Sequence, residues 1–171
     1  MATVYTDPNG DSTPMEWFIH TNPDNYYSNI DDGVRQPTVP STDRVGTSST
    51  VTEDATFDMA TISVGTNVPN ITVWIYAAAV APPDAGVCWG SIYTSGQWSS
   101  FQDFGISENY MWLSISFQGS YTQSDIDALR IRLRRDYTPS ASPNISVSAL
   151  YAEITHGTEG GVGTNSFFFV S

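Results

Sequence analysis

The sequence predicts an all-β fold: a two-sheet antiparallel sandwich, jelly-roll-like, with about eight or nine strands. Apolar and polar residues alternate with a period of two in several short segments, while long runs of helix-forming Ala, Leu, Glu and Lys are missing. Clusters of Gly, Pro, Asn and Asp separate these segments, as turns do. The expected strands are residues 16–20, 56–64, 71–79, 87–93, 97–104, 110–117, 129–135 and 145–154.

Two segments depart from the strand pattern. One short helical turn is predicted near residues 124–129, where Ser124 can cap the helix and Asp125 and Asp127 lie favourably in its first turn. The stretch 35–54 is polar and contains two prolines, so we expect a long surface loop there.

The chain of 171 residues is long enough to bury one hydrophobic core, so a single sandwich domain is expected over residues 1–156. Residues 157–171 form a glycine-rich C-terminal arm with an apolar end. That end either inserts into a neighbouring subunit or returns to its own sandwich as an edge strand, and the sequence leaves both open. The apolar residues of the arm are Phe167, Phe168, Phe169 and Val170.

The charge and composition of the chain argue against several classes of function. The 18 acidic residues outnumber the 6 basic ones, and the net charge of −12 repels polyanions, so we expect no nucleic-acid partner. We find neither a secretory signal nor an apolar run of about 20 residues, and therefore expect no membrane partner. The single cysteine, Cys88, forms no internal disulfide and is interpreted as a small buried hydrophobe. No cofactor is expected, and calcium is the alternative.

All six basic residues are arginines, and four of them lie within residues 130–135. Strict alternation predicts that Ile131 and Leu133 face the core, while Arg130, Arg132 and Arg134 share the opposite face. Like charges in a row need acidic partners. Those partners are either acids of the same chain or a second molecule, in which case the three arginines form an interface. A phosphate or a sulfated glycan is a third option.

Asp7, Asn9 and Asp11 have the alternating oxygen spacing with which a calcium-binding loop begins. Ser12 and Phe18 then stand where such a loop requires glycine and a bidentate glutamate. We therefore favour a tight turn at residues 7–10 over a calcium site.

The aromatic residues raise the question of sugar binding, because sugar rings stack on exposed aromatic faces. Trp98, next to Gly96 and two serines, is the best candidate for an exposed ring, and Tyr26 and Tyr27 could assist it. Trp74 and Trp112 lie in strongly apolar segments, so we expect them in the core. No pattern pairs a nucleophile with a base, and we expect no enzymatic activity.

In its order of segments, over roughly residues 15–155, the chain resembles the single-domain β-sandwich proteins of phage virions, of the head-decoration and minor-tail type. The resemblance rests on Trp17 with residues 26–32, on Phe57-Asp58, on Gln97-Trp98, on residues 122–131 and on the last strand, 145–154. It implies a structural virion protein, a capsid decoration or tail component, that acts by self-association. Its partners would be copies of itself and other virion proteins, and its location the virus particle. The alternative is a carbohydrate-binding module or adhesin of the same fold.

Overall fold

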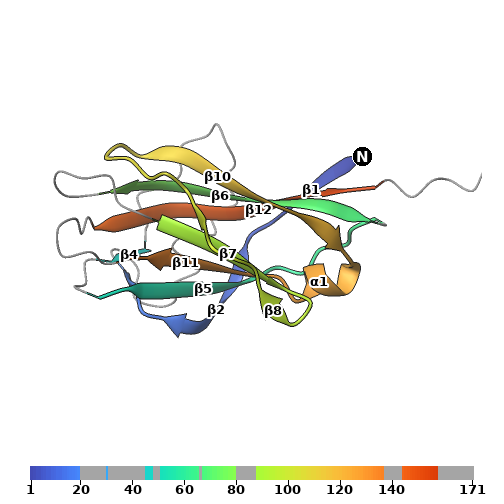
Figure 1. Cartoon of the computed structure of the whole chain (residues 1–171), viewed down its shortest axis with the longest axis horizontal. Helices are drawn as coiled ribbons and strands as arrows, with labels where there is room; N and C mark the ends of the chain where they lie inside the picture. Colours follow the sequence, from blue (N-terminus) through green and yellow to red (C-terminus); the bar gives the residue numbers. More distant parts are fainter. Residues whose placement is uncertain are drawn as a thin grey trace, which may run out of the picture.

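A computed structural model describes residues 1–19, 30, 45–47, 51–65, 67–79, 88–136 and 144–157. It confirms the predicted all-β fold, with two antiparallel sheets whose strands run along the long axis of the molecule (Figure 1). No helix in the described part of the chain is long and apolar enough to cross a membrane.

Sheet A has the strand order β10-β6-β12-β4-β3, and β1 pairs with β12 as well. All of its strand pairs are antiparallel. Its strands are β1 (Ala2–Thr6), β3 (Phe18–Ile19), β4 (Val45–Thr47), β6 (Val68–Ala79), β10 (Met111–Tyr121) and β12 (Ile145–His156).

Sheet B has the order β2-β5-β11-β7-β8, with β9 also paired to β7. From β5 to β12, successive long strands alternate between the two sheets, which is the connectivity of a jelly roll. The strands of sheet B are β2 (Pro8–Met15), β5 (Glu53–Met59), β7 (Cys88–Thr94), β8 (Gln97–Trp98), β9 (Gln102–Asp103) and β11 (Arg130–Arg135).

The core lies between the sheets and follows from the alternation of side chains along each strand. Sheet A contributes buried residues such as Val73, Ile75 and Leu150, and sheet B contributes Phe57 and Ile131. Every second residue therefore points to the outside of the sandwich, so each sheet also presents an outer face.

Gly90 on β7 lies directly against side chains of the core. A Cβ at this position would lie 2.4 Å from Cδ1 of Ile115 and 2.6 Å from Cε2 of Phe104. The absence of a side chain at Gly90 allows these two residues to fill the core. The neighbouring thiol of Cys88 is fully buried, as predicted, and burial raises its pKa.

Strands β1, β2 and β4 were not predicted, and the expected number of strands was too low, whereas β3 lies within the expected strand 16–20. The tight turn expected at residues 7–10 is wrong, because Pro8 begins β2. This strand contains Pro8, Gly10 and Pro14, which disfavour strands, but it lies at the edge of sheet B, where proline is tolerated. Within the expected loop 35–54, Val45–Thr47 is a buried strand, and β5 begins at Glu53.

The predicted helical turn exists as α1 (Gln123–Asp127), but its cap is Thr122 and not Ser124. The side chains of Thr122 and Asp125 form a capping box: Asp125 Oδ2 accepts the Thr122 backbone N–H at 2.8 Å, and Thr122 Oγ1 accepts the Asp125 backbone N–H at 3.3 Å. Asp125 also accepts a hydrogen bond from Ser95, which attaches the helix to the end of sheet B.

Candidate functional site

The arginines of β11 lie on the outer face of sheet B, opposite the buried Ile131 and Leu133, as the alternation predicted. Each lies beside a carboxylate of β5 in the same chain. Arg130 Nε lies 2.9 Å from Asp58 Oδ1, and both side chains are exposed. Intrachain pairing, one of the options that the sequence left open, is therefore present. A contact of these arginines with a second molecule stays a prediction.

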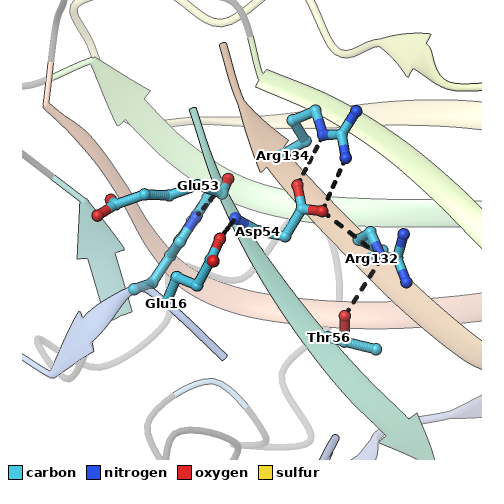
Figure 2. A network of polar contacts seen from close by, with 7 residues as sticks. Glu16, Glu53, Asp54, Thr56, Arg132 and Arg134 are labelled. Atoms are coloured by element: carbon cyan, nitrogen blue, oxygen red, sulfur yellow. Dashed lines mark hydrogen bonds and ion pairs between the residues drawn. The ribbon is translucent and has the colours of Figure 1, made fainter. Parts of the chain in front are cut away.

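Asp54 is the centre of the polar network in Figure 2. Its carboxylate accepts two hydrogen bonds from Arg134, from Nε at 2.7 Å and from Nη2 at 2.8 Å. Arg132 Nε lies farther away, at 3.9 Å from Asp54 Oδ2. The backbone N–H of Asp54 donates to Glu16 Oε2 at 2.7 Å. The hydrogen-bonded carboxylate raises the pKa of Arg134, while burial lowers the pKa of Arg132.

Aromatic rings lie against the guanidinium groups of Arg132 and Arg134. The guanidinium carbon of Arg132 lies 3.8 Å from the centroid of Trp98, and that of Arg134 lies 4.2 Å from the centroid of Phe101. Trp98 is therefore half-buried, with one ring face occupied by Arg132, although it was the best sequence candidate for an exposed sugar-stacking ring. Its predicted companions Tyr26 and Tyr27 lie outside the described residues.

The remaining sequence candidates are not brought together. Asp7 lies between β1 and β2, while Asn9 and Asp11 are exposed on β2. In the described residues, no group of three or more His, Cys, Asp and Glu side chains could hold a metal ion. Calcium at Asp7, Asn9 and Asp11 stays a prediction. The apolar end of the arm, Phe167 to Val170, lies outside the described residues.

The outer face of sheet A carries an aromatic cluster that the sequence analysis missed. Trp74 stacks on Tyr151 with ring centroids 6.1 Å apart and an interplanar angle of 15°. Trp112 touches Tyr151 edge-on at 5.6 Å. The expectation that Trp74 and Trp112 are core residues is wrong, because both are partly exposed. The cluster, called the aromatic face below, consists of Tyr5, Trp74, Tyr76, Tyr110, Trp112 and Tyr151.

Strand register explains why these rings meet. Tyr151 of β12 is the cross-strand partner of Trp74 on β6, and Trp112 of β10 is the partner of Tyr76. Directly paired residues share a face of the sheet, so neighbouring strands place their rings side by side. The edge of the cluster is formed by Tyr5 of β1, which is 46% exposed and lies 5.9 Å from Tyr151.

A polar rim continues the same face along β6 and β10. Asn70 Nδ2 donates to Thr72 Oγ1 at 2.8 Å, and Thr72 Oγ1 lies 3.0 Å from Ser116 Oγ. Gln118 Nε2 donates to Asn70 Oδ1 at 2.8 Å. Register places these four residues on the same face as Trp74. Because each side chain is held by its neighbours, the rim presents amide and hydroxyl groups in fixed positions.

A signal for the aromatic face was present in the sequence. In Val73-Trp74-Ile75-Tyr76, the period of two separates the aromatic residues from the aliphatic ones. The burial of the strand follows this division, with Val73 and Ile75 fully buried and the two rings partly exposed.

No protein-family model and no curated protein matches the chain. Among solved structures, it is similar to the CBM22-1 xylan-binding domain of Paenibacillus barcinonensis Xyn10C, with a TM-score of 0.45, 11% identity, and coverage of 90% of this chain and 94% of that domain. It is also similar to the enzymatically active domain of tailspike protein 4 of bacteriophage CBA120, with a TM-score of 0.45, 8% identity, and coverage of 90% and 19% of the two chains. For the Agl-KA catalytic domain, the TM-score is 0.44, the identity 12%, and the coverage 92% and 28%.

Proposed function

We propose that the protein is a glycan-binding module and that the aromatic face of sheet A is its binding site. The observation that carries the proposal is the grouping of tryptophan and tyrosine rings on neighbouring strands, where partly exposed rings such as Trp74 and Trp112 surround the buried Tyr151, beside a fixed polar rim. Sugar rings have apolar C–H faces that cover aromatic rings, and hydroxyl edges that need hydrogen-bond partners. The two halves of the face supply these two kinds of contact.

Charge on this face also favours a neutral polyhydroxyl ligand. Among the described outer-face positions of β1, β6, β10 and β12, Glu153 is the one charged residue. Its Oε2 accepts a hydrogen bond from Trp74 Nε1 at 3.0 Å. The carboxylate therefore fixes the indole ring, and the other polar groups of the rim are neutral.

A glycan array probed with the full chain tests the proposal, followed by calorimetry with the tightest neutral ligand. Trp74→Ala should weaken binding at least about tenfold, because it removes a stacking ring. Trp98→Ala is the matched control: it also removes a tryptophan, but from the opposite sheet, and should leave the affinity unchanged. Loss of binding in Trp98→Ala with full binding in Trp74→Ala would move the site to sheet B. Silence on the array would reject glycan binding.

A second candidate function is a structural subunit of a virus particle, a capsid decoration or tail component that binds copies of itself and other virion proteins. The observation that favours it is β10, which has 11 residues and lies at the end of sheet A. No strand of the described residues pairs with its outer side, and an edge strand of this length can pair with another chain. This function requires neither a cofactor nor enzymatic activity.

Light scattering across protein concentration tests this second candidate, with the full chain and with a variant lacking residues 158–171. An oligomer that forms in the full chain and is lost on truncation supports assembly through the C-terminal arm. An oligomer that survives truncation contradicts the role of the arm. A monomer in both cases contradicts self-association as the function.

A further inference from the structure

On the outer face of sheet B, the three arginines of β11 differ in how closely a carboxylate is paired with them. Asp54 and Asp58 supply the carboxylates that form ion pairs with Arg130, Arg132 and Arg134. Asp58 is paired with Arg130, and Asp54 is engaged by both Nε and Nη2 of Arg134. Arg132 has only the distant contact with Asp54, at 3.9 Å, and is therefore the arginine whose charge is least compensated.

The donors of Arg132 are also incompletely used. Its Nε donates to Thr56 Oγ1 at 3.4 Å. Figure 2 shows both Nη atoms pointing away from Asp54, and in the described residues neither has a hydrogen-bond partner. The side chain remains 17% exposed. Because the Trp98 ring lies against the guanidinium at 3.8 Å, the plane of the fork is held in place before any ligand arrives.

Two further donors near Arg132 lack acceptors. Ser91 is its register partner on β7, and Trp89 lies two residues away on the same face, opposite Arg134. In the described part of the chain, the buried Ser91 Oγ and Trp89 Nε1 have no hydrogen-bond partner. Buried polar groups are normally satisfied, so these two unused hydrogen-bonding groups are unusual for a site next to an arginine row.

We propose that Arg132 is a binding site for a carboxylate, and specifically for the carboxylate of an acidic sugar. The planar guanidinium fork matches the two oxygens of a carboxylate. A carboxylate brings one negative charge to the one arginine of the row without a close carboxylate partner, whereas a phosphate dianion brings two to a chain of net charge −12. The ring of Trp98 lies against the fork and is in contact with the ring of Tyr93, so the two rings offer apolar area to a sugar ring.

This site is independent of the proposed function, because it lies on the outer face of the other sheet. The two can be tested separately: Trp74→Ala should leave carboxylate binding unchanged, and Arg132→Lys should leave binding at the aromatic face unchanged.

Titration of the full chain with glucuronate, followed by NMR, tests the proposal. We expect saturable binding with a dissociation constant of about 1–10 mM, and no saturation by glucose or inorganic phosphate up to about 50 mM. Arg132→Lys keeps the charge but removes the fork, and should weaken glucuronate binding at least about fivefold. Arg130→Lys is the matched control on the same strand and should bind as the unmodified chain does. Trp98→Leu is a second variant, expected to weaken binding because it removes the ring that holds the fork.

Several outcomes would overturn the proposal. These are equal binding of glucose and glucuronate, absence of saturation by glucuronate up to about 50 mM, and unchanged affinity in Arg132→Lys. A short peptide with a terminal aspartate serves as the other source of carboxylate. Tighter binding of that peptide than of glucuronate would assign the site to an acidic protein partner instead.

Discussion

Trp74 donates its indole N–H to the carboxylate of Glu153 across β6 and β12, with Nε1 and Oε2 3.0 Å apart. The hydrogen bond joins a ring of the aromatic face to the one charged side chain at the described positions of that face. It keeps the indole from turning about its side-chain bonds, so the ring offers a fixed surface to a ligand.

The Glu153 carboxylate is therefore expected to act as a positioning group. Glu153→Ala should weaken glycan binding by about three- to tenfold, because the indole loses its acceptor and is no longer pre-organised. Glu153→Gln retains an oxygen acceptor and should bind within about twofold of the unmodified chain. Calorimetry checks both values, and a loss in Glu153→Gln as large as that in Glu153→Ala would point to a direct role of the negative charge.

The Asp54–Arg134 pair should contribute to stability. Asp54→Asn weakens two charge-assisted hydrogen bonds at a side chain that is only 10% exposed, so the free energy of unfolding should fall by about 2 kcal/mol. Arg130→Gln removes an exposed pair and should cost less than about 1 kcal/mol. Urea denaturation measures both, and equal costs would contradict the ranking by burial.

Asp125 should make the fold less stable in acid. Hydrogen bonds from the Ser95 hydroxyl and from the Thr122 backbone N–H hold the pKa of its carboxyl below the ordinary value of 3.8. A lowered pKa in the folded state stabilises the protein above that ordinary value, and the contribution is lost as the pH falls through the lowered pKa. Asp125→Asn should therefore reduce the stability difference between pH 7 and about pH 3, with Ser95→Ala giving a smaller reduction in the same direction.

Gly90 should not accept a side chain. Gly90→Ala places a methyl group against Ile115 and Phe104, and overpacking of this kind should cost about 1–3 kcal/mol. Ile115→Val removes the closest atom, Cδ1, so the double variant Gly90→Ala/Ile115→Val should recover part of that loss when compared with Ile115→Val alone. Thermal unfolding measures the effect, and strictly additive losses would show that Ile115 is not the obstacle.

The sequence was sufficient for the fold class because alternation and turn residues act locally. It predicted the inward and outward faces of β11 and the extent of β6 closely. The sequence did not predict β2 and β4, because whether these segments form strands depends on their neighbours in the fold. The prolines of β2 (Pro8–Met15) are tolerated because this strand lies at a sheet edge, and β4 (Val45–Thr47) is a short segment within a polar stretch.

The aromatic face illustrates a different difficulty. Trp74 and Trp112 were expected in the core because the surrounding residues are apolar, yet both lie on the outer face of sheet A. Alternation divides such a strand into two faces but does not tell which face meets the second sheet. Trp74 meets Tyr151 only because β6 pairs with β12, which lies about 80 residues later in the chain. The register between two such distant strands depends on the tertiary fold and not on the local sequence.

The five tryptophans allow the central claim to be tested in one experiment, because each indole N–H gives its own NMR signal. The measurement is a titration of the full chain with the neutral oligosaccharide that binds most tightly on the array. Our account predicts that the signals of Trp74 and Trp112 shift on saturation, while those of Trp17, Trp89 and Trp98 remain in place. Shifts confined to Trp98, or no shift at Trp74, would contradict glycan binding at the aromatic face.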